Sequence, residues 1–223
     1  GNGTAGATVG HGLASAPTMV IVKSRTVAGK HWATYHVDLG NTVRIDLESS
    51  GAKITGTGAW NSTTPTSSLV TLGSQSDVNT SSATHIMYAF HDVANYSKFG
   101  SYSGNGSSTG PVVTLGFSPA FLLAKRTDST GNWFIWDSTR DTDGVFNTNI
   151  HPNSSAAEAN SGSNFVTVSS TGFQLTGTGA ETNASGGTYI YMAFADTREY
   201  AYWYDQSGNN NDWTSNGGLT ESD

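Results

Sequence analysis

Two pairs of aromatic residues are the clearest candidates for a binding function in this chain. Trp32 and Tyr35 lie three positions apart. Trp133 and Trp136 repeat this spacing 101 positions later, and Trp203 follows near the C-terminal end. Flat rings with a polar edge suit contacts with sugars, so these five are the predicted binding residues, with a host surface glycan as the ligand.

The spacing within each pair also predicts where the rings lie. Side chains alternate across a strand, so residues three positions apart face opposite sides. We expect one member of each pair in the core and the other within reach of the surface. The alternative, to which we give more weight, is that both members of a pair are buried, either between layers or against a neighbouring subunit.

Four histidines of the first half give no metal-binding pattern. His31 and His36 are five positions apart, so they face opposite sides of an ideal strand. The second half carries other residue types at the matching positions: His31 corresponds to Asn132, His36 to Asp137, His85 to Tyr189 and His91 to Ala195. A metal site needs ligands that converge on one point. We therefore predict no metal ion and no cofactor.

Two groups of acidic residues are candidates for hydrolysis or calcium binding. Asp137, Asp141 and Asp143 lie close together in sequence, whereas glycosidase carboxylates face each other across a cleft, about 5–10 Å apart. Acids this close more often begin turns, so we predict no catalytic residue and no enzyme. Asp205 to Asp212 resembles a calcium loop but lacks the bidentate glutamate of an EF-hand; an Asn/Gly turn is favoured there.

A hairpin that occurs twice must position the aromatic pairs. Residues 13–36 and 117–137 each contain a proline, an apolar strand that ends in lysine, a glycine turn and a strand led by tryptophan. We expect the stems of Lys23 and Lys125 to cover apolar surface. The turns after these lysines distinguish the two copies and are where a ligand would bind. They are Ser24–Lys30 and Arg126–Asn132.

The repeat extends beyond the hairpin. Gly1-Asn-Gly-Thr4 recurs as Gly104-Asn-Gly-Ser107, at a spacing of 103. Residues 79–92 match residues 183–196 at a spacing of 104. Nearly constant spacing over a whole unit indicates an internal duplication.

Composition and strand length predict an all-β fold. Charged residues are 12% of the chain and aromatic residues 11%, which favours strands and turns over helices. Short strands between Gly, Ser, Asn and Pro clusters indicate a β-sandwich.

The continuous apolar run Val20–Val22 predicts a strand packed on both faces. Residues 154–159 are the only stretch where we expect a helical turn. We predict two tandem related β-sandwich units of about 100 residues, at 1–98 and 99–198, and a C-terminal extension, 199–223, that begins a further domain.

Charge and hydropathy argue against several classes of partner. The net charge is −7 with no Lys/Arg cluster, which speaks against nucleic acid. No apolar run reaches the ~20 residues of a membrane span, so we expect no membrane insertion. The absence of cysteine excludes disulfides and thiolate chemistry. The first residues lack a signal-peptide pattern and the first methionine is Met19, so we expect a segment of a longer polypeptide.

Several stretches, in the same order and at similar spacing, resemble virion proteins of tailed bacteriophages. They are Ala16-Pro-Thr-Met-Val-Ile-Val-Lys23, Tyr96-Ser-Lys-Phe-Gly-Ser-Tyr-Ser-Gly-Asn-Gly106, Lys125-Arg-Thr-Asp-Ser-Thr-Gly-Asn-Trp133 and Asn183-Ala-Ser-Gly-Gly-Thr-Tyr-Ile-Tyr-Met-Ala-Phe194. The resemblance covers residues 1–198 and implies a structural protein of tail fibres or other surface appendages. Trp203-Tyr-Asp-Gln-Ser-Gly-Asn-Asn-Asn-Asp212 resembles the opening strand of laminin-G or concanavalin-like domains.

These observations together favour a non-enzymatic structural module of a phage particle, which serves assembly and display. Its expected partners are other virion proteins and further copies of itself in a homo-oligomer such as a trimer, since permanent interfaces are poor in charge. Its expected location is the virion, after synthesis in the bacterial cytoplasm. The alternatives are a receptor-binding module for host glycans, a head decoration protein and a depolymerase.

Overall fold

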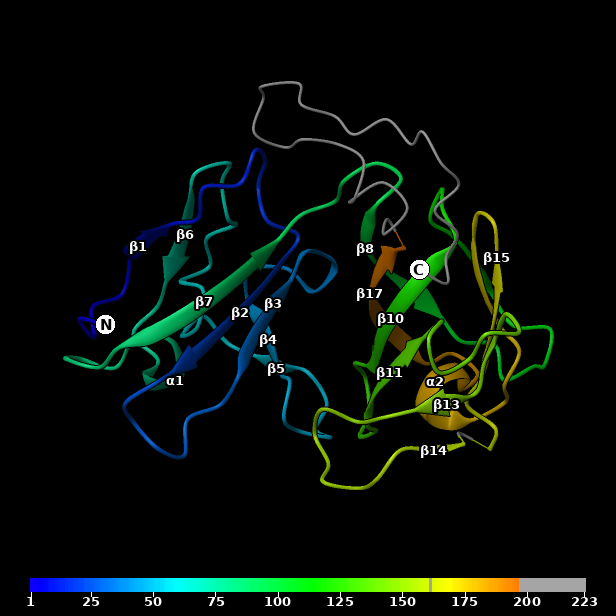
Figure 1. Ribbon diagram of the computed structural model, residues 1–223. Coiled ribbons are helices and arrows are strands. Elements are labelled where there is room, and N and C mark those ends of the chain that lie inside the picture. Colours follow the sequence, from blue (N-terminus) through cyan, green and yellow to red (C-terminus); the bar gives the residue numbers. More distant parts are fainter. Residues whose placement is uncertain (161, 197–223) are drawn as a thin grey trace, which may run out of the picture.

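Antiparallel strands make up nearly all the regular structure of the computed structural model, which describes residues 1–160 and 162–196 (Figure 1). The prediction of an all-β chain is confirmed. Within the described residues, no helix is long and apolar enough to cross a membrane.

The first half holds a five-stranded sheet, in the order β5-β4-β3-β2-β7, and a separate pair, β1-β6. The strands are β1 (Ala7–Gly10), β2 (Met19–Ser24), β3 (Ala33–His36), β4 (Val43–Asp46), β5 (Ile54–Thr55), β6 (Leu69–Leu72) and β7 (His85–Phe90). A 3-10 turn, η1 (Val37–Leu39), follows β3, and a short helix, α1 (Ser76–Asn79), precedes β7.

The second half holds two four-stranded sheets, in the orders β11-β10-β17-β8 and β12-β15-β16-β9, and the pair β13-β14. The strands are β8 (Ser97–Ser103), β9 (Val112–Thr114), β10 (Pro119–Arg126), β11 (Trp133–Asp137), β12 (Val145–Phe146), β13 (Thr148–Asn149), β14 (Ala159–Asn160), β15 (Val166–Ser169), β16 (Gly172–Leu175) and β17 (Thr188–Ala195). A second short helix, α2 (Ala180–Asn183), precedes β17.

The sheets are arranged in layers (Figure 1). Three apolar cores lie between them. One core joins the β1-β6 pair to the five-stranded sheet, and another joins the two four-stranded sheets. The third lies between the main sheets of the two halves and contains Ile21, Leu123 and Ile190. Each half is thus consistent with a β-sandwich, and the two halves share one core.

The strand β2 explains why this layering forms. Val20 belongs to the core of the first half, while Met19 and Ile21 belong to the shared core. All three are at most 7% exposed. A strand covered on both faces needs a continuous apolar run instead of an alternating one, and the prediction from Val20–Val22 is confirmed.

The second half repeats the strand pairing of the first. β2 lies between β3 and β7, and β10 lies between β11 and β17, with every pair antiparallel. Asn79 and Asn183, the last residues of α1 and α2, are 1% and 0% exposed. Each donates its side-chain amide to a glycine carbonyl six residues earlier. The division into two domains stays a prediction.

Two local predictions differ from the structure. The predicted boundary between residues 98 and 99 falls inside β8, which pairs with β17 of the second half. The helical turn expected in residues 154–159 does not form; the short helices lie at Ser76–Asn79 and Ala180–Asn183. Each of these short helices precedes the strand that closes its half, β7 or β17. Residues 154–159 instead lead into β14, where Ala159 pairs with Asn149.

Candidate functional site

The predicted binding aromatics are mostly buried. Tyr35 is 2% exposed and meets Trp60 edge to face at 5.8 Å, while Trp133 and Trp136 are 1% and 0% exposed. A ring that stacks on a sugar needs an open face, so the expectation of glycan stacking fails for these three residues. The reason is that further layers cover both faces of the strands that carry them.

The remaining two candidates have different positions. Trp32 is half-buried against the shared core, and Nζ of Lys23 lies 5.8 Å from its ring centroid. Trp203, like the acidic stretch from Asp205 to Asp212, lies outside the described residues. The pairs do face opposite sides, because Tyr35 and Trp32 belong to different cores. In the second pair both members are buried, as in the alternative with the greater weight, so the expectation of one surface ring is wrong for that pair.

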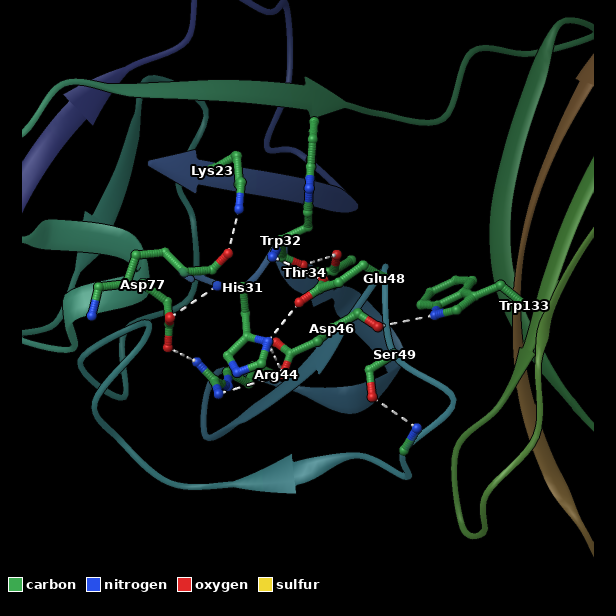
Figure 2. A network of polar contacts seen from close by, with 12 residues as sticks. Lys23, His31, Trp32, Thr34, Arg44, Asp46, Glu48, Ser49, Asp77 and Trp133 are labelled. Atoms are coloured by element: carbon green, nitrogen blue, oxygen red, sulfur yellow. Dashed lines mark hydrogen bonds and ion pairs between the residues drawn. The ribbon is translucent and has the colours of Figure 1, made fainter. Parts of the chain in front are cut away.

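Beside Trp32 the structure brings together five ionisable residues, which we term the Arg44 cluster (Figure 2). Its members are His31, Arg44, Asp46, Glu48 and Asp77. They come from the turn before β3, from β4 and the residues after it, and from α1.

Arg44 is at the centre of this cluster. Its guanidinium lies 2.5 Å from Oδ2 of Asp77 and 3.4 Å from Oδ2 of Asp46. All three side chains are less than a tenth exposed. A buried charge is tolerated only when it is paired, so Arg44 neutralises the two acids that enclose it.

His31 and Glu48 form the outer part of the Arg44 cluster. Nδ1 of His31 lies 2.5 Å from Oε1 of Glu48 and 3.7 Å from Oδ2 of Asp46. The backbone amides of His31 and Trp32 donate to Asp77 and Glu48, both at 3.0 Å. The side chains of His31 and Glu48 are 48% and 36% exposed. The outer pair therefore meets solvent while it anchors the start of β3.

Burial and pairing act oppositely on the two inner carboxyls. Burial raises the pKa of Asp46, and the charges of Arg44 and His31 only partly oppose it. Burial also disfavours the charged form of Asp77, but hydrogen bonds from Arg44 and the His31 amide outweigh it and hold the pKa of Asp77 below its usual value. Oδ1 of Asp46 and Nε of Arg44 are buried without a hydrogen-bond partner.

The second half builds the same arrangement from largely neutral side chains. The amide of Asn132 donates to Glu181 at 2.7 Å, and the amide of Trp133 donates to Asn153 at 2.8 Å. The side chains of Asn153 and Asn132 are joined at 2.8 Å, as Glu48 and His31 are in the first half. Buried Asn149 stands at the position that corresponds to Arg44. Holding the tryptophan amide therefore does not require an ionised side chain, whereas a carboxylate holds the preceding amide in both halves.

The predicted acidic candidates hold turns. Asp137 accepts from the amides of Thr139 and Arg140 and pairs with the Arg140 guanidinium at 2.7 Å. Asp141 accepts from two backbone amides at 2.9 and 3.0 Å, and Asp143 from one at 3.0 Å. Each carboxylate is thus occupied by its own loop, the role that turn residues have.

The turn Arg126–Asn132, a predicted place for a ligand, lies against the first half. The amide of Lys53 donates to the carbonyl of Thr127, and the amide of Gly131 donates to that of Ser50, both at 2.9 Å. Nζ of Lys125 also reaches the carbonyl of Ser50, at 3.4 Å. This turn therefore joins the two halves.

In the described part of the chain, no three His, Cys, Asp or Glu side chains are arranged to hold a metal ion. The Arg44 cluster offers a proton-binding pair at the surface and an internal counter-charge, and none of its five members carries a hydroxyl or thiol group. Sequence reasoning missed Arg44, Asp46, Glu48 and Asp77. The alternate spacing of the first three, which places them on one face of an extended segment, was the available signal.

The comparisons with known proteins give a family without a described activity. Residues 1–198 match the model of a family described as a domain of unknown function (DUF7483). No curated protein and no solved structure matches the chain significantly.

Proposed function

The chain belongs to the DUF7483 family, a domain of unknown function, and we propose that it is a non-enzymatic structural module of a bacteriophage particle. It would sit in a tail fibre or a similar surface appendage and serve assembly and display. The phage assignment derives from the resemblance of residues 1–198 to virion proteins.

One observation carries the structural part of this proposal: the groups that could do chemistry are engaged by the chain itself. Asp137, Asp141 and Asp143 accept backbone amides of their own loops. The Arg44 cluster anchors a hairpin, and in the second half the carboxylate of Glu181 and the neutral amide of Asn153 do the same. Such use of polar side chains supports rigidity rather than catalysis.

The layered cores support the same function. The shared core joins the main sheets of both halves, and hydrogen bonds from the turn Arg126–Asn132 add to it. A module that displays another domain needs to keep its ends at a constant separation. We propose that other virion proteins and further copies of the chain are its partners, with the virion as its location.

Immunogold electron microscopy of intact phage particles tests the proposal. Antibody against this chain should label the tail fibres or other appendages, and mass spectrometry of purified particles should detect its peptides. Label on the capsid would favour the head decoration protein instead. Particles that lack the chain altogether would refute a structural role.

Glycan binding stays an alternative that can be tested separately. Trp32 and Trp203 are the predicted aromatics that burial does not exclude, so a glycan array with the parent chain and a Trp32→Ala variant addresses it. Binding that Trp32→Ala abolishes without loss of folding would favour the receptor-binding module. Release of sugar from host polysaccharide would instead favour the depolymerase.

A further inference from the structure

Within the described residues, no strand lies beside the outer edge of β7, although one lies beside the matching strand of the second half (Figure 1). β7 is the last strand of the five-stranded sheet, and among residues 1–160 and 162–196 none pairs with its outer side. β17 has the same place beside β10 that β7 has beside β2, and β8 covers it over the whole of Ser97–Ser103.

The uncovered edge exposes apolar side chains that its counterpart buries. Ile86 and Tyr88 of β7 are 36% and 43% exposed. The residues 104 positions later, Ile190 and Met192, are 2% and 9% exposed. The missing neighbour accounts for this contrast, because Phe99 of β8 lies opposite Met192.

Backbone groups are uncovered along the same edge. The amide of Arg25 donates to the carbonyl of Thr84 at 2.8 Å, so Thr84 directs its backbone towards β2. In an antiparallel ladder, alternate residues direct both backbone groups to the same side. His85, Met87 and Ala89 therefore direct theirs outwards.

This edge lacks the features that normally prevent strand addition. Proteins protect exposed edges with charged residues, proline, bulges or very short strands. β7 reads His85-Ile-Met-Tyr-Ala-Phe90, with neither lysine nor proline, and its pairing with β2 is regular. The opposite edge of the sheet, β5, is only two residues long. Of the two edges, β7 is the one suited to accept an extended strand.

Gly1 lies beside the start of β7 in the same way that Gly104 lies beside the start of β17. The nitrogen of Gly1 donates to the carbonyl of Ala83 at 2.5 Å, and that of Gly104 donates to the carbonyl of Gly187 at 2.9 Å. Ala83 and Gly187 are 104 positions apart. A Cβ on either Gly1 or Gly104 would lie 2.3 Å from a carbonyl oxygen, so both places require glycine.

The asparagines that follow these glycines are held alike. The amide of Asn2 donates to Oδ1 of Asn79, and the amide of Asn105 donates to Oδ1 of Asn183, both at 2.9 Å. In the second half, the polypeptide that leads into Gly104 is β8. A chain joined to Gly1 would run along β7 in the same way.

We propose that the outer edge of β7 is a docking site for one antiparallel strand with the chemistry of β8, joined to Gly1 in the same polypeptide. The pairing of β8 specifies its pattern. An aromatic residue lies opposite Tyr88, as Phe99 lies opposite Met192, and a small residue lies opposite Met87, as Gly100 lies opposite Tyr191. This inference depends on strand pairing and not on the role in a phage particle, so either can fail alone.

The experiment fuses the sequence of residues 96–103 directly to Gly1 of the full chain and measures amide hydrogen exchange. The amides of His85, Met87 and Ala89 should exchange roughly ten-fold more slowly, or slower still, in the fused protein than in the parent. A matched fusion with proline in place of the residue equivalent to Gly100 removes the central donor and should restore most of the fast exchange.

Two results would overturn the proposal. The first is equal exchange of the β7 amides in the parent and the fused protein, while Tyr191 in β17 is protected in both. The second concerns residues 200–207, which match residues 96–103 at Tyr200, Trp203 and Ser207 at a spacing of 104. In this result, the parent protein alone self-associates and already shows slow exchange of the amides of His85, Met87 and Ala89. If deletion of residues 199–223 abolishes both the self-association and the slow exchange, a second copy of the chain supplies the strand instead.

Discussion

Lys125 gives the most direct test of the electrostatics of the shared interface. Its side chain is 1% exposed, and Nζ donates to the carbonyl of Arg126 at 2.7 Å and to that of Ser50 at 3.4 Å. Burial lowers the pKa of Lys125 from 10.5 to about 8, although the charge of Glu181 opposes the shift. Replacing Lys125 with Met keeps the length of the side chain and removes the titrating group.

The sign of the pH effect follows from this lowered pKa. Between the folded value, near 8, and the unfolded value of 10.5, the unfolded chain binds more protons than the folded one. The free energy of unfolding therefore rises with pH in this window. With ~1.4 kcal/mol per pKa unit, the gain from pH ~7 to pH ~9.5 is about 2 kcal/mol. Burial raises the pKa of Tyr191 to about 12, so that group stays protonated in the folded chain throughout the window.

Urea unfolding at several pH values measures this gain. The parent should gain about 2 kcal/mol relative to Lys125→Met between the two ends of the window. Lys53→Met, which removes the same charge from an exposed position, is the control and should follow the parent. If Lys125→Met shows the same pH dependence as the parent, the buried ammonium is not the cause and this account of the interface is wrong.

Three further variants test the anchors of the hairpins and repeats. Asn183→Ala should lower the free energy of unfolding by about 3 kcal/mol, because it leaves the partners of three hydrogen bonds unsatisfied; Ser185→Ala, at an exposed neighbour, should be neutral in the same urea titration. The double variant His31→Asn with Glu48→Asn copies the neutral pair of the second half and should stay within about 1 kcal/mol of the parent, so a larger loss in thermal unfolding would contradict a purely anchoring role. Arg44→Met should cost about 3–5 kcal/mol, since it strands two buried carboxylates, and a stability equal to the parent's would refute the pairing.

The sequence predicted those features that depend on local pattern. The continuous apolar run at Val20–Val22 indicated a strand covered on both faces, and the three-residue spacing of Trp32 and Tyr35 placed them on opposite sides. Burial of both Trp133 and Trp136 agrees with the alternative that had the greater weight. The sequence did not show which pair would be buried completely, because the number of layers above a strand depends on long-range packing. The Arg44 cluster joins residues up to 46 positions apart, and no local pattern relates the two ends of such a contact.

The second half of the chain provides a comparison for the Arg44 cluster of the first half. Glu48 holds the Trp32 amide and Asn153 holds that of Trp133, at 3.0 and 2.8 Å. An ionisable side chain and a neutral side chain therefore hold the tryptophan amide in the same way. It follows that the charges on His31 and Glu48, both partly exposed, are not required by the fold of the hairpin. If the His31→Asn/Glu48→Asn variant stays folded but loses a pH-dependent property, that property depends on these two side chains at the surface of the first half.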